Sequence, residues 1–291
     1  MVACGPPASS RPQAAPPSAG LLLLSLADGS ERARLSFGQD PLAVVVDETA
    51  NIAYVSDNAA GDVYAVALGK PRVIWKTLVG GRPGPLLVSG GHVLTSLYSD
   101  AAVAELAAGS GQFLRRYSVG RGPGELAGEG QVACADGTVW DLAGHTTRAG
   151  PGFALAAGPG GLWTSDYDGG ALVRVSDGAR VSLPPHAHAF WLATGVAHDL
   201  LVAAEGDRED QDPGFVLRMG DDLRPRVVGV ARDPDQVAEV GGKLFIAAHG
   251  DRAVKVVQGG ATATWSRGAG VVALAPAPQL GLLVVLVNAR E

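Results

Sequence analysis

Cysteine is almost absent from this chain, which has two in 291 residues, Cys4 and Cys134. Cys134 falls in a predicted first strand, residues 131–135, where we expect a small buried apolar side chain. Cys4 lies in an N-terminal segment rich in Pro, Ala and Ser, where we expect it to be modified. The sequence therefore predicts no disulfide within the chain, and the fold has to be stabilised by its apolar core.

Clustered basic charge and long apolar runs are also missing. The chain has 23 Lys and Arg against 29 Asp and Glu, a formal net charge of −6. Nucleic acid is not expected as a partner, because binding its phosphates requires clustered Lys and Arg. No apolar run reaches the ~18 residues of a membrane-spanning segment. The closest run, 271–287, is interrupted by Pro276, Pro278 and Gly281.

The signatures of the commonest enzyme classes do not occur either. The sequence has no Gly-x-Ser-x-Gly elbow, phosphate-binding loop, His-Glu-x-x-His, Cys-x-x-Cys-His or dinucleotide fingerprint. Each of these motifs places a nucleophile, a metal ligand or a phosphate-binding backbone at a fixed spacing. Their absence lowers the odds of the commonest enzymes, and no catalytic residue is assigned.

What the chain does contain is a repeat of short apolar runs separated by turn residues. Residues 41–85 show it best, with apolar runs at 42–46, 52–55, 63–68 and 73–79. The segments between them are polar or rich in Gly and Pro, as turns are. Four strands in a unit of about 40 residues match the period of a β-propeller blade.

The rest of the chain repeats this plan. Six units are predicted, at approximately 41–84, 85–124, 125–152, 153–188, 189–235 and 236–270. Four terminal runs would complete a seventh blade: 21–26, 33–37, 271–275 and 280–287. Pairing of the two chain ends would leave no open sheet edge. The third unit is too short for four full strands, so either it is degenerate or its register is wrong. We predict an all-β fold, a single propeller of seven four-stranded blades over residues 20–291, with six blades as the alternative.

Two segments also carry a family resemblance. IAYVSDNAAGDVYAVAL at 52–68, followed by KTLVGGRPGP at 76–85, resembles the YVTN/YncE-type propeller repeat. SVGRGPGEL at 118–126 is similar to NHL repeats. The match is good in the first two blades, partial in the fourth and sixth, and poor in the third and fifth. The resemblance implies a propeller. The superfamily includes envelope binding proteins, lyases, lactonases and redox-enzyme subunits, so it does not select an activity.

The N-terminal segment, residues 1–19, is expected to be an unstructured tail. Its Val2-Ala3-Cys4-Gly5 resembles the end of a bacterial lipoprotein signal, in which the Cys becomes the lipidated first residue. The apolar leader is missing from this sequence, so either it is encoded upstream or it has been trimmed. The alternative is a chance cysteine in a cytoplasmic tail. We expect lipidation of Cys4, which would tether the propeller in the cell envelope, facing the periplasm or the exterior, as its sole membrane contact.

Each predicted second strand ends in a polar residue. These residues are Asp57, Asp100, Asp141, Asp166, Glu205, His249 and Asn288. The turns after second strands share one face of a propeller with the linkers between blades, so these side chains should ring one mouth of the central channel. Two interpretations are open. Each side chain accepts hydrogen bonds from its own turn, or the ring forms a mainly acidic funnel for a cation or a cationic ligand.

A second candidate site is a group of histidines. His186 and His188 lie in a predicted linker, 184–191, and a His-x-His pair on an extended segment points both rings the same way. His249 belongs to the same predicted face and is expected to approach them. Three imidazoles suit zinc or copper. The alternative is that all three are ordinary loop histidines.

Three further features belong to the same predicted face. The loop 205–212 has five carboxylates, a composition that binds Ca²⁺, but it lacks the glycine and terminal Glu of an EF-hand and is taken as a solvated insertion. Arg82 and Arg121 occupy matching linkers, where they would either contact an anionic group or balance the acidic ring. Trp191, beside His188, is expected to stack on a ligand, whereas the other four tryptophans are expected to pack between blades.

These patterns predict a non-enzymatic propeller that binds a protein or small-molecule ligand at the channel mouth, as a monomer and without a cofactor. The predicted ligand-binding residues are Asp57, Asp100, Asp166, Glu205, His249, Arg82, Arg121 and Trp191. The alternative is a metal-dependent lyase or hydrolase that uses the same face. A divalent metal would then be bound by His186, His188 and His249, or these would act as acid/base groups.

Overall fold

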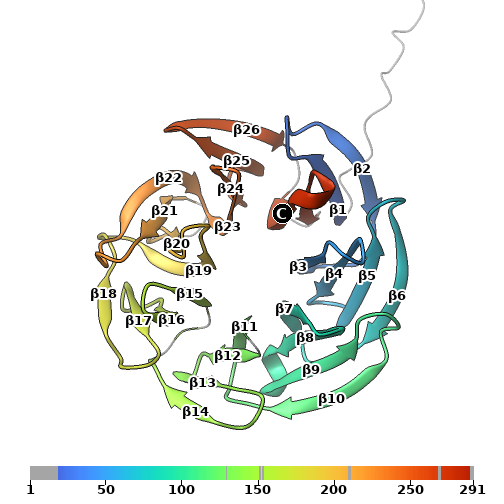
Figure 1. The fold of residues 1–291 in the computed structure, drawn as a ribbon, viewed down its shortest axis with the longest axis horizontal. Helices are drawn as coiled ribbons and strands as arrows, with labels where there is room; N and C mark the ends of the chain where they lie inside the picture. The colour runs from blue at the N-terminus through green and yellow to red at the C-terminus, as the bar shows by residue number, and fades with distance from the viewer. Residues whose placement is uncertain are drawn as a thin grey trace, which may run out of the picture.

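Seven four-stranded antiparallel sheets surround a central axis in the computed structural model of the chain (Figure 1). The structure describes residues 19–128, 130–150, 152, 154–208, 211–267 and 270–288. In this part of the chain the fold is all-β, a seven-bladed propeller, as the repeat predicted. The six-blade alternative is wrong. Cys4 and the predicted tail up to residue 18 lie outside the described residues.

Each blade runs from an inner strand at the channel to an outer strand at the rim (Figure 1). The first blade contains β3 (Pro41–Asp47), β4 (Ile52–Asp57), β5 (Asp62–Ala67) and β6 (Arg72–Leu78). The second contains β7 (Pro83–Ser89), β8 (His92–Leu97), β9 (Ala102–Ala107) and β10 (Phe113–Ser118). The third contains β11 (Pro123–Ala127), β12 (Gln131–Cys134), β13 (Thr138–Trp140) and β14 (Thr146–Arg148).

The remaining blades follow the same order. The fourth contains β15 (Leu155–Gly158), β16 (Gly161–Asp166), β17 (Ala171–Arg174) and β18 (Arg180–Ser182). The fifth contains β19 (His188–Thr194), β20 (Leu200–Glu205), β21 (Pro213–Met219) and β22 (Arg226–Arg232). The sixth contains β23 (Pro234–Val240), β24 (Lys243–Ala248), β25 (Ala253–Gln258) and β26 (Ala261–Arg267). The closing blade contains β27 (Gly270–Ala277), β28 (Leu282–Asn288), β1 (Gly20–Ser25) and β2 (Glu31–Ser36).

The two middle strands of a blade are buried on both faces, which explains their continuous apolar sequences. In the first blade, β4 and β5 are buried along nearly their whole length, whereas the outer strand β6 is largely exposed. Apolar side chains of neighbouring blades pack face to face, and the described residues form seven such cores, one between each adjacent pair of blades. All five tryptophans contribute to these cores, which confirms the predicted inter-blade packing of the other four and adds Trp191 to them.

The closing blade joins the two ends of the chain. The N-terminal strand β1 pairs with the C-terminal strand β28 over six residues, from Gly20 with Val287 to Ser25 with Leu282. The order β2-β1-β28-β27 confirms the predicted seam. β1 lies between β2 and β28, and β28 lies between β1 and β27. The backbone hydrogen-bonding groups of both strands therefore have strand partners on each side, and neither strand is an open edge.

The third blade corrects two details of the sequence interpretation. It has four strands, but they are short, with five, four, three and three residues. Its second strand is β12, so Cys134 belongs to a second strand and not to a first one; the thiol is free and buried, and burial raises its pKa to about 11. Asp141 follows the third strand, β13, and so it does not belong to the predicted ring. Asp136, in the turn after β12, takes that position.

One face of the ring carries both the linkers between blades and the turns after second strands, because successive strands of a blade run in opposite directions. We call it the linker face. Among the described residues the helical elements are two single 3₁₀ turns, η1 (Tyr98–Asp100) and η2 (Pro278–Leu280). Within the described residues, no helix has the length and apolarity needed to cross a membrane.

Candidate functional site

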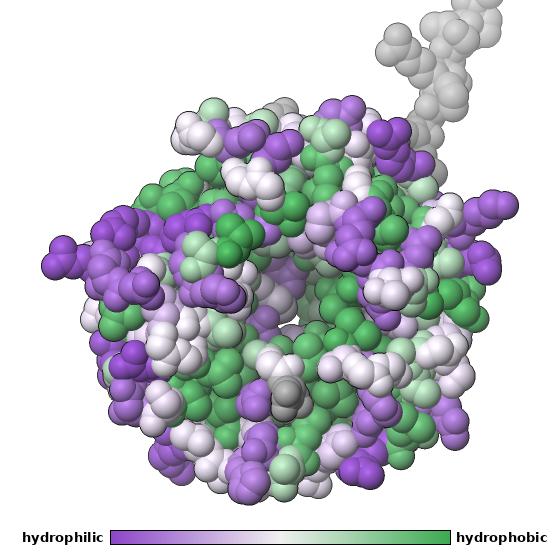
Figure 2. Space-filling view, in the orientation of Figure 1, coloured by the Kyte–Doolittle hydropathy of each residue, from purple (hydrophilic) through white to green (hydrophobic). Residues whose placement is uncertain are grey.

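The linker face opens into a cavity of about 570 Å³ at the mouth of the central channel, which we call the mouth cavity. All seven blades contribute residues to its wall. A second cavity of about 440 Å³ lies along the inner strands, and Glu125, Trp191 and Gln236 line both. Figure 2 shows one face of the ring, hollowed at its centre, with hydrophobic residues around the hollow and hydrophilic ones towards the rim.

The mouth cavity is shaped by a recurring β-bulge. In six blades the inner strand loses register with its neighbour close to the linker face. The residues skipped by the register are Leu42, Gly84, Pro85, Gly124, Glu125, Phe190, Asp235 and Val272. Every one of them lines the mouth cavity. A bulge redirects a side chain that the regular pleat would aim elsewhere, so these residues face the channel.

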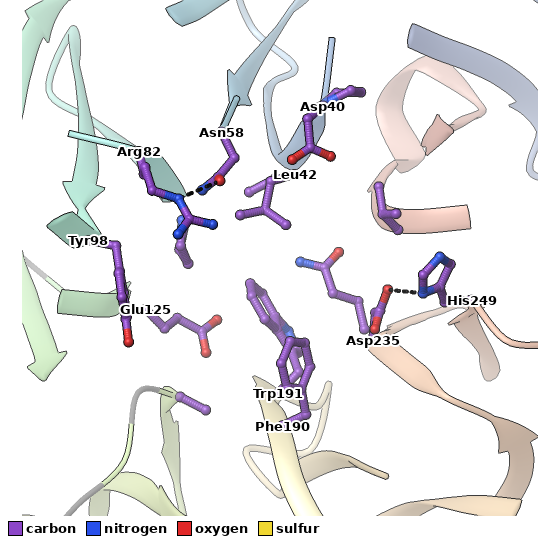
Figure 3. Close-up of a pocket in the computed structure, with 18 of the residues that line it drawn as sticks. Asp40, Leu42, Asn58, Arg82, Tyr98, Glu125, Phe190, Trp191, Asp235 and His249 are labelled. Carbon is purple, nitrogen blue, oxygen red and sulfur yellow. Dashed lines mark hydrogen bonds and ion pairs between the residues drawn. The ribbon is translucent and has the colours of Figure 1, made fainter. Parts of the chain in front are cut away.

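Several parts of the wall are apolar and aromatic. Leu42, Tyr98, Phe190 and Trp191 come from three different blades and all line the cavity (Figure 3). Leu42 is 39% exposed and Tyr98 52% exposed, high values for side chains of this kind. Such surface favours the stacking or burial of an apolar group.

Arg82 provides a positive charge on the same wall. Its Nε donates to the side-chain oxygen of Asn58 at 3.0 Å (Figure 3), and Asn58 in turn donates to the Pro83 carbonyl oxygen at 3.4 Å. Within the described part of the chain no carboxylate forms an ion pair with Arg82, which is exposed. The predicted placement of Arg82 in a linker on this face is what the structure shows, with a guanidinium available for an anionic group.

Glu125 is the buried acid of the channel. Its Oε2 accepts the backbone N–H of Leu155 at 3.0 Å, and its carboxyl also accepts the N–H of Leu192. The Glu125 side chain of the third blade thus accepts hydrogen bonds from the inner strands of the fourth and fifth blades, β15 and β19. Burial raises the pKa of Glu125 well above its usual value, although the two N–H donors oppose the shift.

His249 stands between two carboxylates on the opposite part of the wall. Its Nδ1 lies 3.0 Å from Oδ2 of Asp233. It also lies 3.8 Å from Oδ2 of Asp235, the pair joined by a dashed line in Figure 3. Ligand atoms of the three residues all lie within 4.8 Å of one another. One imidazole and two carboxylates form a donor set that can hold a divalent metal ion.

Four acids of the predicted ring bind donors in turns, linkers and neighbouring strands. Asp57 accepts the N–H groups of Gln39 at 2.6 Å, Asp40 at 3.1 Å and Ala60 at 3.0 Å, and its residue is fully buried. The other three acids have neighbouring donors: Asp100 binds Arg116, Asp166 binds Arg180 and the N–H of Gly169, and Glu205 binds the Tyr167 hydroxyl. None of these four acids lines the mouth cavity, whereas His249 and Asn288 of the predicted ring do. The predicted role of the four acids in ligand binding stays a prediction.

The three histidines predicted as one metal site are not brought together. His186 and His188 both contact Asp207, with His186 Nδ1 at 2.5 Å from Oδ2 and His188 Nε2 at 3.3 Å from Oδ1. Among the described residues, the group that could hold a metal contains His249 but neither of the other two. The expectation that His249 approaches the pair is therefore wrong, because its Nδ1 contacts Asp233 whereas the other two histidines contact Asp207.

His188 has a local structural role. Its Nδ1 lies 2.9 Å from the Tyr167 carbonyl oxygen and its ring packs on the Tyr167 ring. The hydrogen bond to that carbonyl is the main cause that raises the pKa of His188, and Asp207 adds to it. In turn, hydrogen bonds from His186 and then His188 lower the pKa of Asp207. Trp191, which is predicted to stack on a ligand, lines the mouth cavity, and its stacking role stays a prediction.

The remaining predicted residues have local partners. The backbone N–H of Arg121 donates to Asp136 at 2.8 Å, and Arg121 is not among the residues of the cavity wall. In the acidic loop, Arg208 binds Asp212 at 2.6 Å and Asp207 binds the two histidines. Glu209 and Asp210 lie outside the described residues. The described carboxylates of this loop therefore have partners, in keeping with a solvated insertion.

Sequence reasoning missed several residues of the cavity wall. Asp235, Glu125 and Phe190 read as ordinary residues of an inner strand, and nothing in their spacing marks the bulge that redirects them. One signal was available: Pro83, Pro123 and Pro234 each begin an inner strand and are each followed by a residue of the cavity wall. Proline at a strand start removes one ladder donor, which permits the irregularity.

Comparison with known proteins adds information on the fold. No protein-family model and no curated protein sequence matches this chain. Among solved structures, a streptogramin B lyase superposes with a TM-score of 0.70 at 11% identity, covering 92% of this chain and 98% of the other. BamB from Moraxella catarrhalis gives 0.56 at 15% identity, covering 94% and 96%. The Cps50 (Swd1) β-propeller domain of Myceliophteria thermophila gives 0.62 at 11% identity, covering 86% and 97%. At these identities the likeness concerns the fold alone.

Proposed function

We propose that this chain is a ligand-binding propeller that takes a small molecule or a short peptide segment into the mouth cavity, without catalysis. The observation that carries the proposal is the cavity wall itself. Bulges direct apolar and aromatic side chains into a hollow of about 570 Å³ that also contains a few convergent polar groups. Concave apolar surface with sparse, fixed polar groups is typical of ligand sites.

The charges of the wall suggest the chemistry of the ligand. Arg82 presents a guanidinium beside Tyr98, and Asp235 and His249 lie across the cavity (Figure 3). A guanidinium binds a carboxylate through paired N–H donors, and an aromatic wall stacks on a planar group. We infer that the ligand carries an aromatic or apolar group next to a carboxylate.

Ligand-observed saturation-transfer NMR tests this inference. Phenylacetate and phenethylamine serve as probes of matched size and opposite charge, and N-acetyl-tryptophan serves as a larger aromatic acid. We expect the two acids to bind in preference to the amine, with the preference lost in Arg82→Gln and all binding weakened in Tyr98→Ala. Arg224→Gln, in the turn after β21 on the opposite face, is the matched control and should bind as the wild type does. Absence of binding by all three probes, or equal binding by Arg82→Gln, would contradict the proposal.

A second candidate function is metal-dependent lyase or hydrolase chemistry in the same cavity. The observation that favours it is His249 beside two carboxylates at the cavity wall. The superposition with a streptogramin B lyase is compatible with this candidate but carries the fold alone. Histidine and carboxylate are the residue types that supply metal ligands and acid/base groups.

Three finer properties complete the proposal. We propose a YVTN- or NHL-like repeat origin on the strength of the segments at 52–68 and 118–126, and a monomeric state because the ring closes on itself. We also propose a place in the cell envelope through lipidation of Cys4, on the strength of the Ala-Cys-Gly sequence around it. Intact-mass measurement of the protein from its own host, expressed with its upstream coding sequence, would reveal the lipid as an added mass on Cys4.

A further inference from the structure

The start of the sixth blade brings three potential metal ligands together by backbone pairing. Asp233 directly precedes β23, Asp235 is the bulged residue of that strand, and His249 directly follows β24. The two strands pair from Pro234 with Ala248 onwards. The backbone N–H of His249 donates to the Asp233 carbonyl oxygen at 2.9 Å, which fixes the two residues across the strand ends. The position of the group therefore follows from the fold of the blade and not from flexible side chains.

The distances in this group suit one shared ion. Two donor atoms that are each about 2.1 Å from a metal can be at most about 4.2 Å apart. His249 Nδ1 lies 3.0 Å from Asp233 Oδ2 and 3.8 Å from Asp235 Oδ2, so both separations meet this limit. The three ligand atoms fall within 4.8 Å of one another, so only a small adjustment would centre them on an ion.

Asp233 supplies a separate indication. Its residue is 2% exposed, and its Oδ1 is a buried atom for which the described residues provide no hydrogen-bond donor. A buried carboxylate oxygen without a partner is costly, because it has lost its hydration and gained nothing in exchange. A cation bound beside it would compensate that loss. His249 alone compensates only Oδ2.

Two basic residues near the group bind another carboxylate. Arg232, which precedes Asp233, binds Asp251 with its Nε at 3.1 Å from Oδ1. Lys255 lies 3.5 Å from Asp251 as well. Arg232 and Lys255 are therefore both paired with a third carboxylate, that of Asp251. The group itself combines two carboxylates with one imidazole, a donor set of a kind that favours a bound cation.

We propose that Asp233, Asp235 and His249 bind one divalent transition-metal ion at the wall of the mouth cavity. Imidazole is a ligand for zinc and related first-row metals, whereas calcium and magnesium prefer all-oxygen sites. Zinc or manganese is therefore the expected class. Since Asp235 and His249 line the mouth cavity, the ion would face whatever enters it, with coordination positions left for water or a ligand. The inference goes beyond the proposed ligand binding and does not depend on it.

Titration of the metal-free protein with the metals alone tests this site. The full chain is stripped with a chelator and titrated with ZnCl₂ by calorimetry and with MnCl₂ by electron paramagnetic resonance, with CaCl₂ for comparison. We expect one ion per chain for zinc or manganese, with calcium at least tenfold weaker. Asp235→Asn and His249→Gln should each lower the affinity at least roughly tenfold, since even outer-shell partners are worth about 10–100-fold.

The control uses the other two histidines. A protein with both His186→Gln and His188→Gln retains the proposed ligands and should bind the metal with unchanged affinity. Asp233→Asn is avoided, because Asp233 is buried and its replacement would also affect folding, whereas Asp235 and His249 are partly exposed. Circular dichroism confirms that each variant is folded. No saturable binding of zinc or manganese, or binding that survives in Asp235→Asn and His249→Gln, would overturn the proposal. So would binding that disappears in the control. Failure here would leave the aromatic-acid binding to be judged by its own NMR experiment.

Discussion

Asp57 is predicted to be a structural residue whose loss lowers stability, since its own side chain does not line the mouth cavity. Its carboxylate is fully buried at the end of β4 and accepts three backbone N–H groups, from Gln39, Asp40 and Ala60. Two of these donors belong to the linker from the closing blade, and the third belongs to the turn after β4. Replacement with alanine removes all three acceptors at once.

The expected loss can be estimated from these contacts. A hydrogen bond to a charged acceptor contributes about 1.5–3 kcal/mol, so three would give about 4.5–9 kcal/mol if they were independent. They share one carboxylate, and water can reach part of the linker, so we expect about 4 kcal/mol for Asp57→Ala. For a domain of this size, roughly 2 °C in Tm accompanies each kcal/mol, which predicts a fall of about 8 °C. Asp57→Asn keeps one good acceptor and should lie in between.

Urea denaturation followed by far-UV circular dichroism measures the loss, with differential scanning fluorimetry for Tm. The matched control is Asp177→Ala, at an exposed turn on the opposite face where the carboxylate binds Arg174 and the N–H of Ala179. Solvent replaces those contacts, so its effect should be much smaller. Equal stability of the two alanine variants would refute the turn-capping role of Asp57. A normal Tm with lost binding of N-acetyl-tryptophan would instead support the ligand-binding interpretation of the ring.

Two further predictions concern the channel and the inter-blade cores. Burial raises the pKa of Glu125, so between the unfolded and the folded pKa the folded chain holds a proton that the unfolded chain releases. The stabilisation from this proton is complete below about pH 4, the usual pKa range of glutamate. It is lost as the pH rises through the folded pKa. Glu125→Gln should therefore be more stable than the wild type at neutral pH and converge with it in acid, and parallel urea curves that stay equal at every pH would contradict this. Trp163 is fully buried between the fourth and fifth blades and donates to the Pro159 carbonyl oxygen. Its replacement with alanine should lower the free energy of unfolding by about 3–5 kcal/mol, and replacement of half-buried Trp265 should lower it less. Calorimetric unfolding compares the two variants.

The fold was predictable because the repeat is visible in short apolar runs and turn residues. The pairing of the chain ends was predictable too, since the two strands at each terminus form a complete four-stranded blade only if they share one sheet. The third blade was harder. Residues 138–140 form an apolar run followed by Asp141, which looks like a second strand, yet β12 pairs with both β11 and β13 and takes that place. Sequence alone does not reveal which of two short runs lies between the others.

The site was predictable in outline and not in detail. His249, Arg82 and Trp191 were placed at the channel mouth, and they are there. The partners of His249 were not found, because Asp235 reaches the cavity only through a bulge, and a bulge depends on pairing between strands. The histidine cluster failed for a related reason: a shared face does not bring side chains of different blades into contact, and His186 and His188 found a closer carboxylate in Asp207.

The closing blade also decides how the ring responds to force. Gly20 pairs with Val287, so the end of β1 that leads to the N-terminus and the end of β28 that leads to the C-terminus lie together at one end of the seam. Tension between the two termini would therefore act in unzipping geometry: it would break the six residue pairs one after another, starting with Gly20 and Val287, and would not load them all at once in shear. A ring without an open edge would still yield to a small pull applied at its ends, and it would yield first between β1 and β28.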